Sequence, residues 1–154
     1  MNADGAAETI ELAKDLKGDA TFHALDVTDE SKIDAFAAAF HETHKQADIV
    51  VNVAGWDISM PFMDNDSDFI RKVVAINYLG PVYLTRAFLP QMIEGDGGQI
   101  VNTASDAGRV GSMGETVYSG AKGGVIAFTK SLAREMARYR INVNCVAPGP
   151  TDTP

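Results

Sequence analysis

The chain has 154 residues, of which 45% are hydrophobic, and a formal net charge of -8. That length and composition are typical of one globular domain, and an acidic surface disfavours nucleic-acid binding because it repels phosphate. The single cysteine, Cys145, excludes a disulfide framework within the chain and fits a reducing, cytoplasmic compartment. No apolar stretch is long enough to predict a membrane span, and the first residues do not resemble a signal peptide.

The first third of the sequence predicts a helix, a strand, a second helix and a second strand. Apolar residues at helical spacing indicate a helix over 5–17, and a strand follows from Thr21 to Val27. Thr28 is a good N-cap for a helix over 29–45, which has one apolar face. Residues 48–55 form a continuous apolar run that ends in glycine, as expected for a strand buried in a parallel sheet.

The remainder continues this alternation. We expect a loop over 56–65, a long helix over 67–92, a strand from Gln99 to Ala104, a loop of small residues, a helix over 116–139 and a strand over 141–147. Alternating strands and helices predict an α/β fold with a doubly wound parallel sheet in one domain, 1–154. Ligands of such sheets bind beyond the carboxyl ends of the strands. The residues predicted there are Asp26, Asn52 to Gly55, Ser105, Pro148 and Gly149.

Tyr118 and Lys122 are four residues apart in the last predicted helix, so their side chains share one helix face. A free tyrosine has a pKa near ~10, and an adjacent ammonium favours the phenolate and lowers that pKa. The pair can therefore act as an acid/base group at neutral pH. Taken alone, the spacing is equally that of a solvated helix face.

Two further polar residues stand in positions that suit chemistry. Ser105 directly follows a predicted strand, where its hydroxyl can hydrogen-bond a substrate oxygen, although a loop serine or helix cap has the same appearance. Asn77 lies inside the long helix, and Pro81 four residues later has no N–H to donate to the Asn77 carbonyl. That carbonyl is a natural water site if it faces a cleft. Alternatively, Pro81 only kinks the helix.

Together, Tyr-x-x-x-Lys, a serine thirteen residues before the tyrosine, Asn-x-Ala-Gly at 52–55, the mid-helix Asn77 and Pro-Gly at 148–149 resemble the short-chain dehydrogenases/reductases. The resemblance covers nearly the whole chain. It implies a Rossmann-like domain that transfers a hydride between NAD or NADP and a secondary alcohol or ketone. It also implies that Tyr118 is the general acid/base, that Lys122 lowers its pKa and binds the nicotinamide ribose, that Ser105 holds the substrate oxygen and that Asn77 binds a relay water.

The resemblance further implies a set of cofactor contacts. Asp26 and Val27 would contact the adenine, and Asn52, Ala54 and Gly55 would form a wall of the cleft. Pro148, Gly149, Thr151 and Thr153 would surround the nicotinamide amide, beside Tyr118 and Lys122. Val53 departs from the family, which usually has a second asparagine at this place.

The family's Gly-x-x-x-Gly-x-Gly phosphate turn does not occur in the sequence. We therefore expect an incomplete fold in which the first two strands and the last strand of the family are missing, with Met1 internal to a longer reading frame. Such a sheet would have unpaired edges, unless the strand from Thr21 to Val27 pairs with the strand over 48–53. An inactive fragment or a non-catalytic binding module of the same fold is the alternative function.

The substrate is less well indicated. Residues 56–58, 104–111 and 148–153 are similar to enzymes that oxidise 2-hydroxycyclohexanecarboxyl-CoA, while 3-oxoacyl-carrier-protein reductases are the alternative. Arg109 would meet an acyl-CoA phosphate or remain a solvated loop residue, and Asp106 and Glu115 are expected to be polar loop residues. Because residues 2–4 contain no basic side chain to meet a 2′-phosphate, NAD is favoured over NADP.

No metal site is expected, because His41 and His44 lack a third ligand and fit a solvated helix face. Small residues in the last helix, Gly120, Gly123 and Gly124 among them, permit close helix packing. The family uses such helices for a homodimer or homotetramer. Packing of the helix within its own chain is the alternative.

Overall fold

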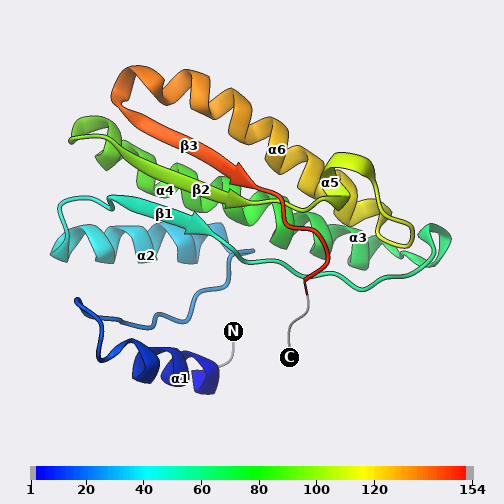
Figure 1. Ribbon diagram of the computed structural model, residues 1–154, viewed down its shortest axis with the longest axis horizontal. Coiled ribbons are helices and arrows are strands. Elements are labelled where there is room, and N and C mark those ends of the chain that lie inside the picture. The colour runs from blue at the N-terminus through cyan, green and yellow to red at the C-terminus, as the bar shows by residue number, and fades with distance from the viewer. Residues whose placement is uncertain (1–2, 152–154) are drawn as a thin grey trace.

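The computed structural model describes residues 3–151 and shows a parallel sheet with helices packed on it (Figure 1). The described strands are β1 (Ile49–Asn52), β2 (Gly98–Thr103) and β3 (Ile141–Val146), in the order β1-β2-β3. Val50 pairs with Ile100, which in turn pairs with Val143, so one row of apolar side chains crosses the sheet. This confirms the predicted α/β fold, Rossmann-like and incomplete.

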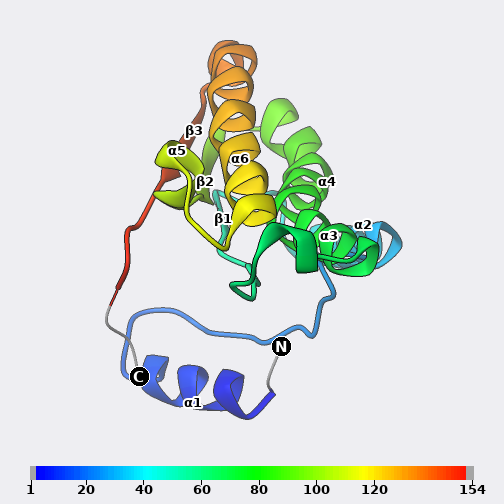
Figure 2. The ribbon, with the colours of Figure 1, turned by 90° about the vertical axis from the view of Figure 1, so that its right-hand side faces the viewer.

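Three long helical segments cover one face of this sheet. They are α2 (Glu30–Thr43), the segment formed by α3 (Ser67–Val74) and α4 (Gly80–Glu94), and α6 (Thr116–Met136), followed by a 3₁₀ turn at Ala137–Tyr139. Figure 2 shows these helices together on one side of the strands. The core lies between helices and sheet, and its buried side chains include Ile100, Val143, Phe88, Met92, Leu132 and Met136.

The predicted strand from Thr21 to Val27 is wrong. Residues 19–26 have no assigned secondary structure, and a turn follows at 27–28. A strand needs a hydrogen-bonded neighbour, and β1 pairs only with β2 among the described residues, so the predicted pairing with residues 48–53 does not occur. Val27 instead packs against Gly80, where an added Cβ would lie 3.0 Å from Val27 Cγ2.

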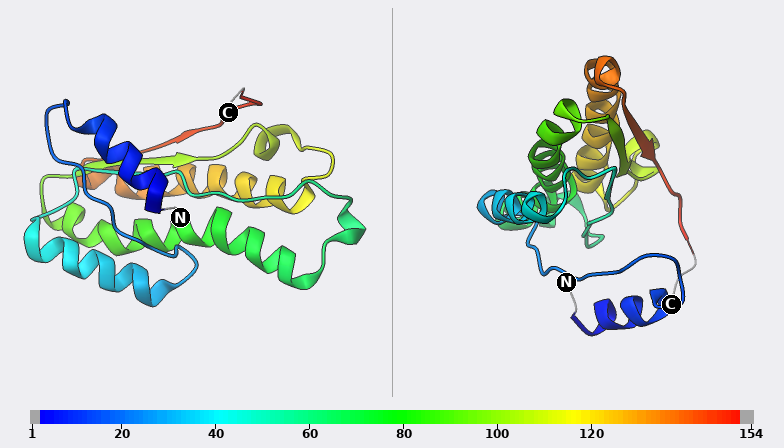
Figure 3. Two further views of the ribbon diagram at one scale, coloured as in Figure 1. Left: turned by 90° about the horizontal axis from the view of Figure 1, so that it is seen from below. Right: turned by 90° about the vertical axis from the view of Figure 1, so that its left-hand side faces the viewer.

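The first helix does not cover the sheet, and the face of the sheet opposite the three long helical segments is largely exposed. Helix α1 (Ala3–Ala13) is shorter than the predicted 5–17 and stands apart from the sheet in the right-hand view of Figure 3. On the open face of β1, Ile49 is 58% exposed and Val51 54% exposed. The apolar strand predicted from the sequence is thus buried on one side only.

The N-cap of α2 is Asp29 and not Thr28. The Asp29 carboxylate accepts a hydrogen bond from Lys32 N at 3.2 Å and one from the Ser31 hydroxyl at 2.6 Å. Thr28 donates both its N–H and its hydroxyl to Asp26, at 2.9 and 2.7 Å. The turn at the start of α2 is therefore organised by two carboxylates in succession.

His41 does not lie on a solvated helix face as predicted. Its ring packs 5.3 Å from that of Phe88, and its nitrogens are buried without a hydrogen-bond partner among the described residues. The cause is the packing of α2 against α4. His44 stacks on Phe40 at 4.5 Å. No cluster of three or more potential metal ligands is found in residues 3–151.

The long predicted helix contains a π-helical turn, Ala75–Leu79, between α3 and α4. Gly80 N–H donates to the Ala75 carbonyl five residues back, and Pro81 has no N–H for the Asn77 carbonyl. A proline four residues after Asn77 thus coincides with a widened turn, and such turns are frequent at functional sites. The predicted loops also contain short helices, a 3₁₀ turn at Phe62–Asp64 and α5 (Ala107–Val110).

None of the helices within residues 3–151 combines the length and the apolar character that crossing a membrane requires.

Candidate active site

A cavity of about 610 Å³ lies beyond the carboxyl ends of the strands. Its wall combines residues that follow β1, β2 and β3 with the start of α6. Among the predicted site residues, Gly55, Ser105, Tyr118 and Gly149 line it. The residues from separate predicted strand ends are therefore gathered around one space.

Ser105 and Tyr118 both lie on this wall, and the Ser105 hydroxyl is close enough to the phenol to affect its pKa. Ala104 N–H donates to the Val146 carbonyl at 2.8 Å, so the ladder between β2 and β3 continues up to the residue before Ser105. The Ser105 hydroxyl also accepts from Ala107 N at 3.2 Å, which orients it at the start of α5. The sheet thus fixes the serine, and the first turn of α6 fixes the tyrosine opposite it.

The pKa of Tyr118 is raised, which corrects the expectation that Lys122 lowers it. Burial is the main cause, the interaction with the Ser105 hydroxyl lowers the pKa, and the charges of Glu115 and Asp57 raise it. Lys122 Nζ lies 5.6 Å from the centre of the tyrosine ring and donates to the Thr103 carbonyl at 2.8 Å. The phenol is therefore protonated at neutral pH in this state of the protein.

Lys122 is almost completely buried, with 2% of its surface exposed. Burial lowers the pKa of this lysine, and a nearby Cys145 raises it. Its position is set by close packing of α5 on α6, because a Cβ added at Gly108 would lie 2.6 Å from the backbone carbonyl carbon of Lys122. The ammonium donates to the Thr103 carbonyl, and Lys122 is not among the residues that line this cavity.

Asn77 holds the segment after β1 against the helices. Its amide nitrogen donates to the carbonyls of Trp56 at 2.6 Å and Val73 at 3.0 Å, and its amide oxygen accepts from Trp56 N at 3.2 Å. A Cβ added at Gly55 would stand 3.2 Å from Asn77 Oδ1 and 3.7 Å from Lys122 Nζ. Gly55 thus lets the strand end approach both residues, as its lack of a side chain allows.

A second cavity, of about 740 Å³, adjoins the first, and Gly55 and Trp56 line both. Asp26, Val27 and Ala54 also line this second cavity, so the residues predicted to contact the adenosine end lie together. At the other end, the Pro148 carbonyl accepts from Asp106 N at 2.9 Å, and the Thr151 hydroxyl donates to the Gly149 carbonyl at 3.1 Å. Thr153 lies outside the described residues.

The family model described as short chain dehydrogenase matches residues 1–154. The chain belongs to the short-chain dehydrogenase family. It is 35% identical over 153 residues to 3-oxoacyl-[acyl-carrier-protein] reductase FabG from Chlamydia pneumoniae, covering 99% of this chain and 62% of that protein. It is 34% identical over 143 residues to carbonyl reductase family member 4 from Xenopus tropicalis, covering 91% and 61%.

Solved structures agree with this assignment. A crystal structure of NAD⁺-bound xylitol dehydrogenase matches with a TM-score of 0.94 and 30% identity, covering 100% of this chain and 60% of that one. A short-chain dehydrogenase from Streptomyces avermitilis matches with a TM-score of 0.90 and 32% identity, covering 99% and 55%. This short-chain dehydrogenase chain therefore spans less than two thirds of the length of these relatives.

Asn52 occupies a different place in this short-chain dehydrogenase from the one expected. Its side chain turns into the core, where its amide nitrogen donates to Thr85 Oγ1 at 3.1 Å and to Asn102 Oδ1 at 2.8 Å. Asn102 in turn donates to Thr129 Oγ1 at 2.9 Å, and Thr129 donates to the Val125 carbonyl at 2.8 Å. This buried polar network joins α4, β1, β2 and α6, so the Asn52 side chain belongs to the scaffold, and Asn52 lines neither of the two cavities described above.

Three polar or aromatic residues of the site were not predicted as catalytic or cofactor-binding residues: Trp56 and Asp57 belonged only to the substrate resemblance, and Glu115 was expected to be a polar loop residue. Trp56, Asp57 and Glu115 line the cavity beside Tyr118. Trp56 packs between Lys72, whose Nζ is 3.6 Å from the ring centre, and the Phe69 ring at 5.5 Å. Their places after β1 and directly before α6 were the available signal, because residues at those positions face the carboxyl ends of the strands.

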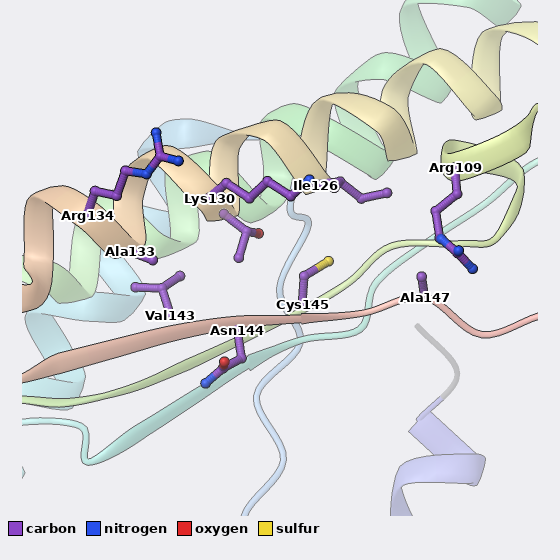
Figure 4. A pocket seen from close by; sticks show the side chains of 10 residues that line it. Arg109, Ile126, Lys130, Ala133, Arg134, Val143, Asn144, Cys145 and Ala147 are labelled. Atoms are coloured by element: carbon purple, nitrogen blue, oxygen red, sulfur yellow. The ribbon is translucent and has the colours of Figure 1, made fainter.

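A further hollow, of about 700 Å³, lies between α6 and β3, as Figure 4 shows. Arg109, Lys130 and Arg134 give it a basic rim around Cys145, and none of the predicted catalytic residues lines it. Arg109 also pairs with Asp106 at 2.8 Å. This hollow is therefore separate from the cavity that Tyr118 lines.

The glycines of α6 serve contacts within the chain. Cβ atoms added at Gly123 and Gly124 would stand 3.2 Å from the Gly108 carbonyl oxygen and from the Tyr78 ring, respectively. Gly120 alone among these three has open space around it. The alternative of packing within the chain therefore accounts for Gly123 and Gly124.

Proposed function

We propose that this protein catalyses hydride transfer between NAD(P) and a secondary alcohol or ketone, with Tyr118 as the general acid/base. The observation that carries the proposal is that Ser105 and Tyr118 line one cavity, where the serine hydroxyl is close enough to the phenol to affect its pKa. A carbonyl oxygen placed between the two hydroxyls would receive hydrogen bonds from both as negative charge develops on it. Because its pKa is raised, Tyr118 starts in the form that donates a proton in ketone reduction.

The described residues fit the two ends of a dinucleotide. The cavity with Asp26 and Val27 adjoins the cavity with Tyr118 at Gly55 and Trp56, so the two ends of an extended cofactor would lie on either side of these two residues. NAD(P), when bound, supplies or accepts the hydride. Lys122 would hold its nicotinamide ribose, and Asn77, through its grip on Trp56, would keep the wall between the two cavities in place.

We favour NAD over NADP because residues 2–4, which the family resemblance places at the adenosine ribose, contain no basic side chain. Lys32 and Lys72 line the cavity at Asp26 and are the cations nearest to that end. Titration with NADH and NADPH, followed by cofactor fluorescence, compares the two directly. Tighter binding of NADPH would overturn the preference.

An uncharged cyclic ketone and a β-ketoacyl thioester are suitable first substrates. The sequence resemblance suggests acyl thioesters of CoA or of carrier protein as substrates. We expect turnover that Tyr118→Phe reduces by more than about 100-fold, since general acid/base catalysis contributes roughly that much. Tyr139→Phe, outside the site, is the control. Turnover that survives in Tyr118→Phe would refute the assigned role.

A non-catalytic fragment or binding module is the second candidate. It is favoured by one observation, the lack of a Gly-x-x-x-Gly-x-Gly turn in the sequence, because that turn binds the pyrophosphate of the cofactor in this family. The absence of saturable binding at millimolar cofactor would support it. We further propose a homodimer or homotetramer, as in the family, and light scattering on the purified protein tests this.

A further inference from the structure

Two carboxyl groups stand on the wall of the cavity beside Tyr118. Asp57 belongs to the segment after β1, and Glu115 directly precedes α6. Both line the same cavity as Ser105 and Tyr118, and both are half-buried. Their placement brings two acidic groups to the point where a substrate would meet the proposed catalytic hydroxyls.

The two carboxyl groups are close to each other and to the phenol. Burial raises the pKa of Asp57, and the charge of Glu115 raises it further. Both charges also add to the raised pKa of Tyr118. Asp57 Oδ2 is buried and has no hydrogen-bond partner among the described residues. The cavity wall therefore carries an acidic oxygen that the described part of the chain leaves unpaired.

The loops that carry these groups are tied together. Met60 N–H donates to the Gly114 carbonyl at 2.9 Å, and Gly114 adopts a φ of 79°, which glycine tolerates. A Cβ at Gly114 would lie 2.5 Å from the Ser59 hydroxyl oxygen, so the two loops are in direct contact. This contact ties together the two loops that carry Asp57 and Glu115.

No cation on the described wall offsets their charge. The residues that line the cavity include no Lys, Arg or His, and the third carboxylate on the wall, Asp106, is already paired with Arg109. Lys122 donates to the Thr103 carbonyl and is not among the lining residues. An anionic group next to a reacting carbonyl would thus meet two like charges in a partly buried space, where Coulomb repulsion is stronger than in water.

We propose that Asp57 and Glu115 select substrates by charge, admitting molecules that are uncharged around the reacting carbonyl or alcohol, such as esters and thioesters, and excluding free oxo acids and hydroxy acids. The inference rests on the proposed function, since it names the substrate class of that site. It assigns to these carboxylates a specificity role that is separate from the proton transfer by Tyr118.

The first test compares ethyl acetoacetate with acetoacetate, which differ in the charge beside the ketone. We expect the Asp57→Asn and Glu115→Gln variants each to raise the ratio of kcat/KM for acetoacetate over ethyl acetoacetate by about tenfold, and the double variant by more. Glu94→Gln, an exposed acidic residue of α4, is the control and should leave the ratio unchanged. An unchanged ratio in an active double variant overturns the proposal.

A second test needs neither cofactor nor turnover. Trp56 is the only tryptophan and lines the same cavity, so its fluorescence reports which solutes enter. We expect the double variant to raise the quenching constant of iodide by at least about twofold and to leave that of neutral acrylamide unchanged, because the local potential becomes less negative. Equal iodide quenching in both proteins overturns the proposal. If the double variant raises iodide quenching as expected but the protein turns over neither the ester nor the acid, the result counts against the proposed function and not against the charge selection.

Discussion

The buried polar network around Asn102 makes a prediction that can be worked out from its distances. Asn102 is fully buried, donates to Thr129 Oγ1 at 2.9 Å and accepts from Asn52 Nδ2 at 2.8 Å. Asn102→Ala removes both hydrogen bonds, each worth about 1 kcal/mol net, and leaves a small cavity. We expect the free energy of unfolding to fall by about 2 to 4 kcal/mol, since buried groups that lose their partners add their own desolvation cost.

Urea unfolding followed by circular dichroism measures this loss. With a slope of roughly 2 kcal/mol per molar urea, the midpoint of Asn102→Ala should fall by about 1 to 2 M. Thr85→Val removes a single hydrogen bond from the same network and should cost less, about 1 kcal/mol. Asn142→Ala, in β3 and exposed, is the matched control and should stay within about 0.5 kcal/mol of the unmodified protein. If Asn102→Ala were no more destabilising than this control, the network would not hold the sheet to its helices.

Further predictions concern the α2 cap, the π-helical turn and the packing of α5. The pKa of Asp29 is lowered to about 2, mainly by hydrogen bonds from Ser31 and Lys32. The charged carboxylate therefore stabilises the fold fully above a pH of about 3.8, and this contribution is lost as the pH falls through about 2. The difference in urea midpoint between the unmodified protein and Asp29→Ala should shrink between pH 4 and pH 2. Asn77→Ala should increase acrylamide quenching of Trp56, because it removes both hydrogen bonds that hold the Trp56 backbone, and unchanged quenching would contradict that role. Gly108→Ala should lower the melting temperature, because the added Cβ would clash with the α6 backbone. Gly120→Ala, in open space within a helix, should instead stabilise the protein by up to about 1 kcal/mol. A reversal of these two signs would contradict the packing described.

The sequence predicts the sheet and its helices well where periodicity is strong. The strands at 49–52, 98–103 and 141–146 and the helix from Thr116 follow the predicted pattern, because their apolar spacing and their flanking glycines and prolines are local properties. The strand from Thr21 to Val27 was wrong because a strand depends on a neighbour, which no local pattern reveals. The π-helical turn was likewise beyond periodicity, although Pro81 marked its position.

The candidate site shows the same division between local and distant information. Ser105, Tyr118 and Gly149 could be placed together from the ends of strands and the start of a helix. The direction of the Tyr118 pKa was not predictable, because it depends mainly on burial and in part on Asp57, which comes from the segment after β1. The inward turn of Asn52 was also missed, since its partners Thr85 and Asn102 are 33 and 50 residues away.

The π-helical turn between α3 and α4 has a consequence for how this helix can change in evolution. A π turn contains one residue more than the α-helical turn it replaces, so removing one residue from 75–79 would restore regular winding while preserving the packing of Phe88 and Met92 further along α4. The same deletion would change the direction in which the Asn77 side chain leaves the helix, because Asn77 lies within the turn that is rewound. Length changes at this point are therefore compatible with folding of the helix and incompatible with the contact to Trp56, so we expect the length of this segment to be constant among relatives that retain the site.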